Sequence, residues 1–143
     1  MRESKFRGKR LDNGEWEHGD LVRFGQKCHT PCKCAIIPGT ALGSDPLCKI
    51  LFDYEVDSAT VGQYTGLKDN KSTEIYEGDI VQLDYITTCG KHRIGLSFEV
   101  RWSTQEGCWF GWDGFVGNAL QQMHKMFVVK GNIHDNPELL KTE

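Results

Sequence analysis

Thiol and imidazole side chains gather in one short stretch of the chain, where they could bind a metal ion. The stretch covers 21 residues and holds Cys28, His29, Cys32, Cys34 and Cys48. Thiolate and imidazole are the ligands that Zn²⁺ prefers in tetrahedral sites. One prediction is therefore a zinc site formed by Cys28, Cys32, Cys34 and Cys48. The spacing fits imperfectly, because structural zinc sites usually contain two Cys-x(2–4)-Cys pairs, and here a single distant cysteine follows Cys-x3-Cys-x-Cys.

Free thiols in a loop, or a disulfide formed after purification, are the alternatives to zinc, and no other cofactor is expected. The N-terminal sequence is charged and lacks the apolar stretch of a signal peptide. The apolar runs are also far shorter than the ~18 to 20 residues that cross a bilayer. We therefore expect a cytoplasmic protein with no membrane partner, in a compartment that keeps thiols reduced.

Three cations alternate with other residues near the N-terminus. Lys5, Arg7 and Lys9 would share one face of a strand, because successive side chains point to opposite faces of a sheet. Such a stripe could bind the phosphates of a nucleic acid. The alternative is an edge strand whose charges prevent pairing with another sheet. Bulk charge favours no partner, because 17 Lys and Arg against 20 Asp and Glu leave a net charge of −3.

Aromatic residues crowd the segment from 102 to 115. Alternation places Phe110 and Trp112 on one face of a strand and Trp109 on the other. A domain this small needs large side chains to bury enough apolar area. The expected core residues are Phe98, Val100, Trp102, Phe110 and Trp112. Trp109 is then the candidate surface aromatic, either as a stacking platform or as half of a subunit contact.

The sequence does not predict catalysis. Asp20 and Asp79 each follow a glycine, a position where an aspartate accepts hydrogen bonds within a turn. The five histidines lie in separate segments without a local nucleophile and base. Neither a GxxxxGK[ST] phosphate loop nor an HExxH motif occurs. We therefore expect that the protein is not an enzyme.

Apolar and polar residues alternate with period two, which predicts a mostly β chain. Asp12-Asn13-Gly14 indicates a hairpin, because Asn-Gly tolerates the positive φ angles of a tight turn. Asn136 and Pro137 are typical of an N-cap and a first helical residue, so a short terminal helix is expected, held by Leu139 and Leu140. The segment 29–46 is expected to be an irregular excursion or a boundary between two parts of the structure. The expected strands are 5–10, 15–24, 60–65, 79–86, 96–102, 108–112 and 126–133.

Two segments are similar at an offset of 59 residues: EWEHGDLV at 15–22 and EIYEGDIV at 74–81. We interpret each copy as a bend that starts a strand, with chance similarity as the alternative. A real repeat implies two small β modules, which we place at 1–58 and 59–143. The second is expected to form an SH3-like, partly open barrel closed by the terminal helix. Greek-key packing or a single sandwich is the alternative.

The strings VGQYTGLKDN at 61–70 and EIYEGDIV at 74–81 closely resemble the YopX family of bacteriophage and prophage proteins. KFR at 5–7, FEVRW at 98–102 and GNIHDNPELL at 131–140 extend the resemblance over nearly the whole chain. The resemblance implies a mostly β protein of a phage or prophage in a bacterial host, with no catalytic motif and no established biochemical role. Family members often have Asn-Gly after Leu67-Lys68-Asp69, whereas this chain has Asn70-Lys71-Ser72, so a longer turn is expected.

We therefore expect a non-enzymatic phage accessory protein that acts by binding. Its partner would be a second copy of the chain, in a homo-oligomer, or a phage or host macromolecule. The alternative is a nucleic-acid-binding accessory protein that uses Lys5, Arg7 and Lys9. The cysteine segment is not part of the family's motif, so the resemblance gives it no function.

Overall fold

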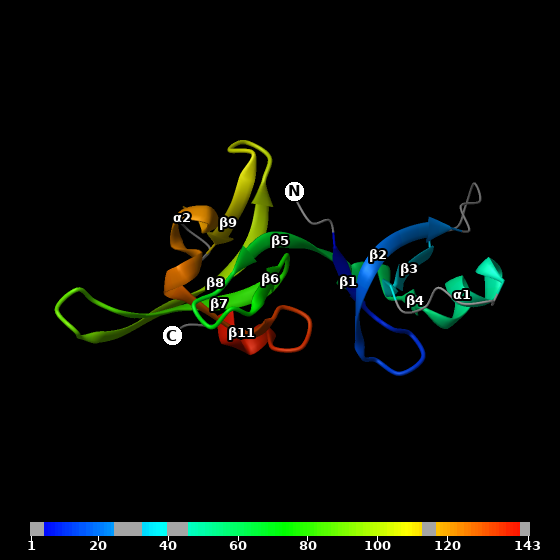
Figure 1. Ribbon diagram of the computed structural model, residues 1–143, viewed down its shortest axis with the longest axis horizontal. Helices are drawn as coiled ribbons and strands as arrows, with labels where there is room; N and C mark the ends of the chain where they lie inside the picture. The colour runs from blue at the N-terminus through cyan, green and yellow to red at the C-terminus, as the bar shows by residue number, and fades with distance from the viewer. Residues whose placement is uncertain (1–4, 25–32, 40–45, 113–116, 141–143) are drawn as a thin grey trace. The chain divides into compact units, whose positions relative to one another are not determined.

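The computed structural model describes residues 5–24, 33–39, 46–112 and 117–140 (Figure 1). The chain is mostly β, as the sequence predicts, and its strands pair in antiparallel fashion. It divides into two compact units, Met1–Tyr64 and Thr65–Glu143; the boundary expected from the sequence is 58/59. Within the described ranges, no helix is long and apolar enough to cross a membrane.

Unit 1 is a twisted antiparallel sheet with the strand order β4-β3-β2-β1-β5. Its hairpin turns at Gly14, which has a φ of 69°, and Arg10 N donates to Glu15 O at 2.9 Å, as the Asn-Gly signal predicts. Two short helices, α1 (Leu47–Asp53) and η2 (Ser58–Thr60), lie between strands. The strands are β1 (Phe6–Lys9), β2 (Trp16–Phe24), β3 (Lys33–Ile37), β4 (Glu55–Val56) and β5 (Gly62–Lys68).

The expectation that the segment 29–46 is irregular is wrong for β3. Cys34, Ala35 and Ile36 are all buried, so β3 shows a continuous apolar run and no alternation. One side of β3 belongs to the unit 1 core, where Cys34 and Ile36 cluster with Val56, and α1 also contacts the strand. A strand buried on both faces cannot be recognised by period two.

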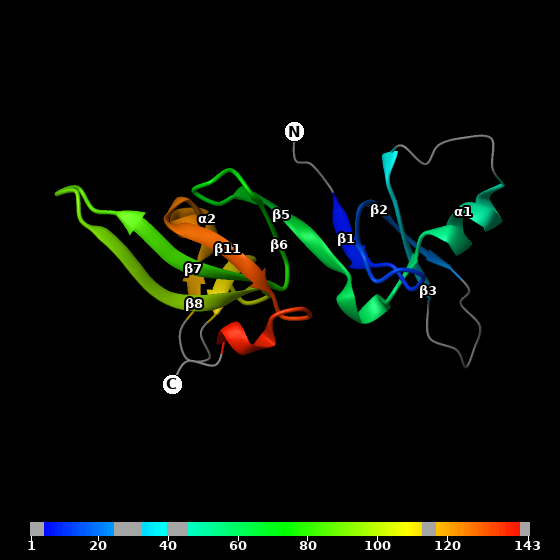
Figure 2. The same cartoon turned by 90° about the horizontal axis from the view of Figure 1, so that it is seen from below.

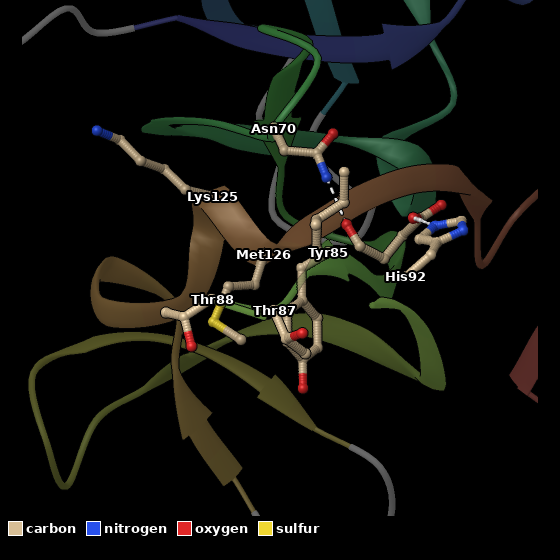
Figure 3. A pocket seen from close by; sticks show the side chains of 9 residues that line it. Asn70, Tyr85, Thr87, Thr88, His92, Lys125 and Met126 are labelled. Carbon is tan, nitrogen blue, oxygen red and sulfur yellow. Dashed lines mark hydrogen bonds and ion pairs between the residues drawn. The ribbon is translucent and has the colours of Figure 1, made fainter. Parts of the chain in front are cut away.

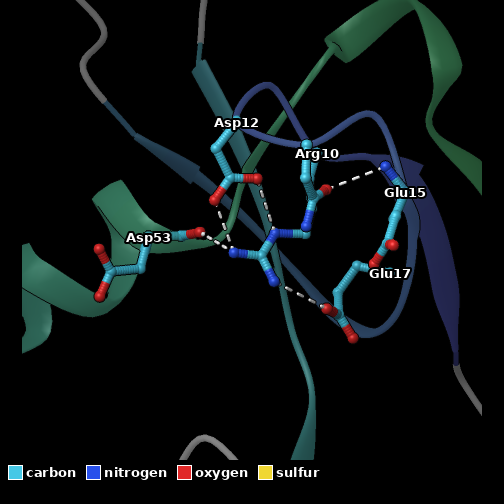
Figure 4. A network of polar contacts seen from close by, with 6 residues as sticks. Arg10, Asp12, Glu15, Glu17 and Asp53 are labelled. Atoms are coloured by element: carbon cyan, nitrogen blue, oxygen red, sulfur yellow. Dashed lines mark hydrogen bonds and ion pairs between the residues drawn. The ribbon is translucent and has the colours of Figure 1, made fainter.

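A network around Arg10 holds the first hairpin of unit 1 against the end of α1 (Figure 4). The Arg10 guanidinium donates to Asp12 Oδ2 at 2.7 Å and to the Asp53 carbonyl at 3.0 Å. Glu17 lies 3.6 Å from it, and the Tyr54 ring centre lies 5.0 Å from its central carbon. The hydrogen bond with Arg10 lowers the pKa of Asp12, and the same bond raises the pKa of Arg10.

Unit 2 contains the end of β5, the short strand β6 (Glu74–Tyr76) and a five-stranded sheet in the order β10-β9-β8-β7-β11. The terminal strands of that order do not pair with each other among the described residues, so the sheet is partly open and not a closed barrel. The helices are α2 (Leu120–Met123), η3 (His124–Met126) and η4 (Pro137–Leu140). The remaining strands are β7 (Asp79–Ile86), β8 (His92–Ser103), β9 (Cys108–Trp112), β10 (Gly117–Ala119) and β11 (Phe127–Asn132).

The expected terminal helix is present as η4, a single 3-10 turn in which Leu139 N donates to Asn136 O at 3.1 Å. Leu139 remains exposed, and Leu140 is half-buried. The expected strands 79–86 and 108–112 have the observed bounds of β7 and β9. The short strands β4, β6 and β10 and the helices α1 and α2 were not predicted, because segments of two to seven residues show too little periodicity.

The core of unit 2 takes the opposite face of β9 from the one predicted. Trp109 is only 8% exposed and belongs to the core, so its expected role as the surface aromatic is wrong. Trp102 is 42% exposed, and Phe110 and Trp112 are half-buried. The β8–β9 register explains this result. Val100 pairs with Gly111 and Trp102 with Trp109, so these residues share the inner face.

The other core residues of unit 2 are large and apolar. Phe98 and Val100 are buried as predicted, and Phe98 packs against Phe127 with ring centres 5.6 Å apart. Such a tilted aromatic pair contributes about 0.5 to 1.5 kcal/mol beyond its buried area. The remaining members of the cluster are Ile75, Val81 and Leu120.

Candidate binding surface

The predicted zinc ligands fall partly outside the described residues. Cys28 and Cys32 lie there, as does His29. Cys34 is buried in β3 among apolar core residues, and Cys48 is part of α1. In the part of the chain that the structure describes, no group of three His, Cys, Asp or Glu residues could hold a metal ion. The zinc site stays a prediction.

The basic stripe lies against aromatic rings. Arg7 and Lys9 both stack on Trp16, at 4.7 and 5.7 Å from the ring centre, and Lys5 lies 5.4 Å from the centre of Tyr64. Arg7 is buried, with 7% exposure. The edge-strand explanation is wrong, because β1 pairs with β2 on one side and β5 on the other. The stripe is thus part of a central strand, and its middle cation is not presented to solvent.

The two aspartates of the repeat have different environments. Asp79 is buried and accepts a hydrogen bond from Tyr76 N at 2.7 Å, which closes the turn between β6 and β7 as predicted. Gly78 in this turn has a φ of 86°, in the region that favours glycine. Asp20 is exposed inside β2, which runs from Trp16 without a new strand starting at Gly19. Gly19 is needed for another reason: a Cβ there would lie 2.2 Å from Ile37 O.

Asp69, in the 61–70 string, organises the turn between β5 and β6. It is buried, and its Oδ1 accepts hydrogen bonds from Lys71 N at 2.8 Å and Thr73 N at 2.9 Å. Its Oδ2 accepts a third from Val129 N in β11 at 2.9 Å. Ser72 has a φ of 65° and therefore takes the left-handed conformation that a glycine would adopt without strain. The carboxylate is thus fully used in holding the fold.

Asn132, in the 131–140 string, also holds a turn through its side chain. Its side chain is buried, and its Oδ1 accepts hydrogen bonds from His134 N at 3.0 Å and Asp135 N at 2.9 Å. The strings that carry the family resemblance therefore place polar side chains where they close turns. A binding surface has to be sought elsewhere.

The hairpin between β7 and β8 is the strongest candidate for that surface. We call residues 84–96 the arm. Among the described residues, β7 and β8 pair there only with each other, through Asp84↔Ile94, Tyr85↔Arg93 and Ile86↔His92. In contrast, β11 pairs with Asp79–Leu83 and β9 with Glu99–Ser103. Both views show the arm extending beyond the other strands of its sheet (Figures 1 and 2).

Large aliphatic side chains are exposed along the arm. Ile86 is 72% exposed, Ile94 63% and Leu96 55%. Single exposed apolar residues are ordinary, but a group of them on one element is typical of an interaction site. This exposure could not be predicted from the sequence, because alternation predicts a strand and not which of its faces another part of the chain covers.

A cleft of about 720 Å³ lies beside the arm, along residues 84–88 (Figure 3). Asn70 Nδ2 donates to the carbonyl of Asp84 at 2.6 Å, and His92 Nε2 lies 2.5 Å from Asp84 Oδ1. Met126 lies beside the base of the arm, and the Lys125 side chain extends outward from η3. The lining residues are Asn70, Asp84, Tyr85, Ile86, Thr87, Thr88, His92, Lys125 and Met126.

The charge around this cleft is mostly positive, although the whole chain carries −3. Asp84 is the only carboxylate among the lining residues. The hydrogen bond with His92 lowers the pKa of Asp84, and the charges of His92, Lys130 and Lys71 lower it further. Lys91 and Arg93 are exposed on the arm itself, and Lys125 is exposed at the rim. An acidic partner would therefore be attracted to this side of unit 2.

These features define an all-β protein of two units, one of which carries a projecting two-stranded arm. The family model described as "YopX protein" matches residues 5–141, so the chain belongs to the YopX family. A similar solved structure is protein EF1440 from Enterococcus faecalis, with a TM-score of 0.57 and 26% identity. That similarity covers 99% of this chain and 100% of the other. A search of curated proteins found no match.

Proposed function

We propose that the protein is a non-enzymatic binding module and that the arm is its contact element. In this proposal it is a phage or prophage accessory protein that acts in the cytoplasm of a bacterial host. The family resemblance supports the phage origin, and the similar protein from Enterococcus faecalis supports a bacterial host. An SH3-like topology for unit 2 is part of the same proposal, supported by its partly open antiparallel sheet.

The observation that carries the proposal is the exposure of Ile86, Ile94 and Leu96 on a ribbon that the rest of its sheet does not cover. Fully burying an aliphatic side chain of this size stabilises a protein or complex by about 1.5 to 3 kcal/mol. That stabilisation is largely unrealised in the free chain. A partner that covers the arm would gain it, whether the partner is a second copy of the chain or a phage or host protein.

The nucleic-acid alternative through Lys5, Arg7 and Lys9 has less support. A phosphate contact requires a cation that reaches solvent, whereas Arg7 is buried against Trp16. The binding module on the arm is therefore the function that the geometry favours.

The test is to purify the tagged full chain from infected or lysogenic cells and to measure what is retained. Ile86→Asp/Ile94→Asp should release the retained macromolecule, because it places charge on the aliphatic surface. The matched control is Leu11→Asp/Phe52→Asp, which changes two equally exposed residues of unit 1, at 60% and 78% exposure. Equal retention by the arm variant and the wild type would refute the proposal.

A further inference from the structure

The edge of β7 that faces the cleft is open beyond Leu83. β11 begins at Phe127, which pairs with Leu83, and the preceding residues belong to η3, so no described strand continues along Asp84–Ile86. Thr87 N, just after β7, donates to Lys91 O, just before β8, at 2.8 Å. Backbone groups alternate between the two edges of an antiparallel strand, so those of Asp84 and Ile86 point away from β8.

Asn70 supports this orientation. Its Nδ2 donates to the Asp84 carbonyl, which must therefore point toward the open edge. Ile86, two residues further along the strand, then directs its N–H and C=O to the same edge. An added strand could pair with Ile86 along the part of the β7 edge that β11 does not reach.

The surroundings of this edge indicate what the added strand would carry. Ile86 and Met126 offer apolar contacts at the cleft, and Ile94 extends that surface along the arm. Lys125 at the rim and Lys91 and Arg93 on the arm offer positive charge, while the single lining carboxylate of Asp84 is already held by His92. These features fit aliphatic side chains together with carboxylates.

We propose that the cleft binds an extended segment of a partner protein that pairs with the open edge of β7 and carries both aliphatic and acidic side chains. This inference rests on the proposed function of the arm and adds the chemistry of the partner. Main-chain hydrogen bonds to Ile86 provide affinity, and the aliphatic and acidic side chains provide specificity.

A nucleic acid fits these observations less well. Phosphate binding uses the positive charge but needs neither an open strand edge nor exposed isoleucines, and interfaces with nucleic acids are more polar than those between proteins. A second copy of the chain would bring an equally basic arm against the first, so like charges would oppose that pairing.

The test selects binders to the immobilised full chain from a random displayed peptide library and measures the affinity of a selected peptide by fluorescence anisotropy. We expect selected peptides to be enriched in Asp or Glu and in Val or Ile. Ile86→Pro removes the edge N–H without removing a β7–β8 hydrogen bond and should weaken binding by at least about tenfold. Ile86→Val keeps that N–H and should bind nearly as the wild type does.

Lys91→Glu/Lys125→Glu is a second variant that does not depend on tolerance of proline. It should also weaken the selected acidic peptide by about tenfold or more, and added salt should reduce the difference. The inference is overturned if no acidic, aliphatic peptides are enriched, or if neither variant weakens binding. It is also overturned if labelled duplex DNA or single-stranded RNA, and not such peptides, binds the arm. Dimerisation of the chain through the arm, with no peptide binding, would overturn it as well.

The two proposals fail differently. Loss of the cellular partner in Ile86→Asp/Ile94→Asp, together with unchanged peptide binding by Ile86→Pro and the charge variant, refutes strand addition and leaves the arm as the contact element. Full retention of the cellular partner by the arm variant refutes the contact element itself.

Discussion

Asp69 is a buried side chain of unit 2 whose carboxylate is held by several hydrogen bonds. Its two carboxylate oxygens accept three backbone N–H groups, one of them from β11, 60 residues away in sequence. Because the side chain is buried, water cannot easily replace it as an acceptor. The residue therefore connects the β5–β6 turn to the sheet and makes the local turn dependent on long-range structure.

Asp69→Ala should lower the free energy of unfolding by about 3 kcal/mol or more, because it removes three hydrogen bonds to a buried carboxylate. Urea unfolding measures the effect. Asp57→Ala is the matched control: Asp57 is exposed and accepts one hydrogen bond from Ala59 N, so its loss should cost only about 0.5 to 1 kcal/mol. Equal losses in the two variants would contradict the role assigned to Asp69.

Ser72 occupies the left-handed position in the same turn. Ser72→Gly should raise the free energy of unfolding by up to about 1 kcal/mol, because glycine adopts this conformation without the steric penalty of a Cβ. The greater conformational freedom of glycine in the unfolded chain offsets part of this gain. Ser72→Ala keeps a Cβ and should give no gain. If Ser72→Gly lowers the free energy of unfolding, the serine side chain stabilises the turn by more than its left-handed backbone conformation destabilises it.

At the scale of elements, sequence alternation identified strands but not which face is inside. β9 alternates as predicted, yet the core takes Trp109 and Gly111, because β8 presents Val100 and Trp102 to them across the register. Which face of β9 is buried depends on the pairing between β8 and β9 and cannot be predicted from the sequence of either strand alone.

Trp109→Ala should therefore lower the free energy of unfolding by about 3 to 5 kcal/mol, as expected for a large buried aromatic. Trp102→Ala should cost clearly less, since Trp102 is 42% exposed and its main described aromatic contact is the edge-to-face pair with Trp109. Thermal or urea unfolding of both variants decides the matter. A larger loss at Trp102 than at Trp109 would contradict the assignment of Trp109 to the core.

At the scale of the whole molecule, period-two patterning and turn residues predict an all-β chain, and the family strings predict the family. Neither predicts the arm. Strand signals at 79–86 and 96–102 indicate two strands, but the pairing of residues 84–86 with 92–94 and the start of β11 at Phe127 arise from the assembled sheet. The candidate surface therefore became visible only with the fold.

In this protein, the residues that hold the fold differ from the exposed residues of the arm that we propose bind a partner. The free energy of unfolding of Ile86→Asp/Ile94→Asp, measured by urea denaturation, tests this separation most directly. We predict that each of the two substitutions changes this free energy by no more than about 0.5 kcal/mol, because both side chains are mostly exposed. A loss of several kcal/mol, comparable to that of Asp69→Ala, would show that the arm is packed in the free protein and would contradict its role as an open contact element.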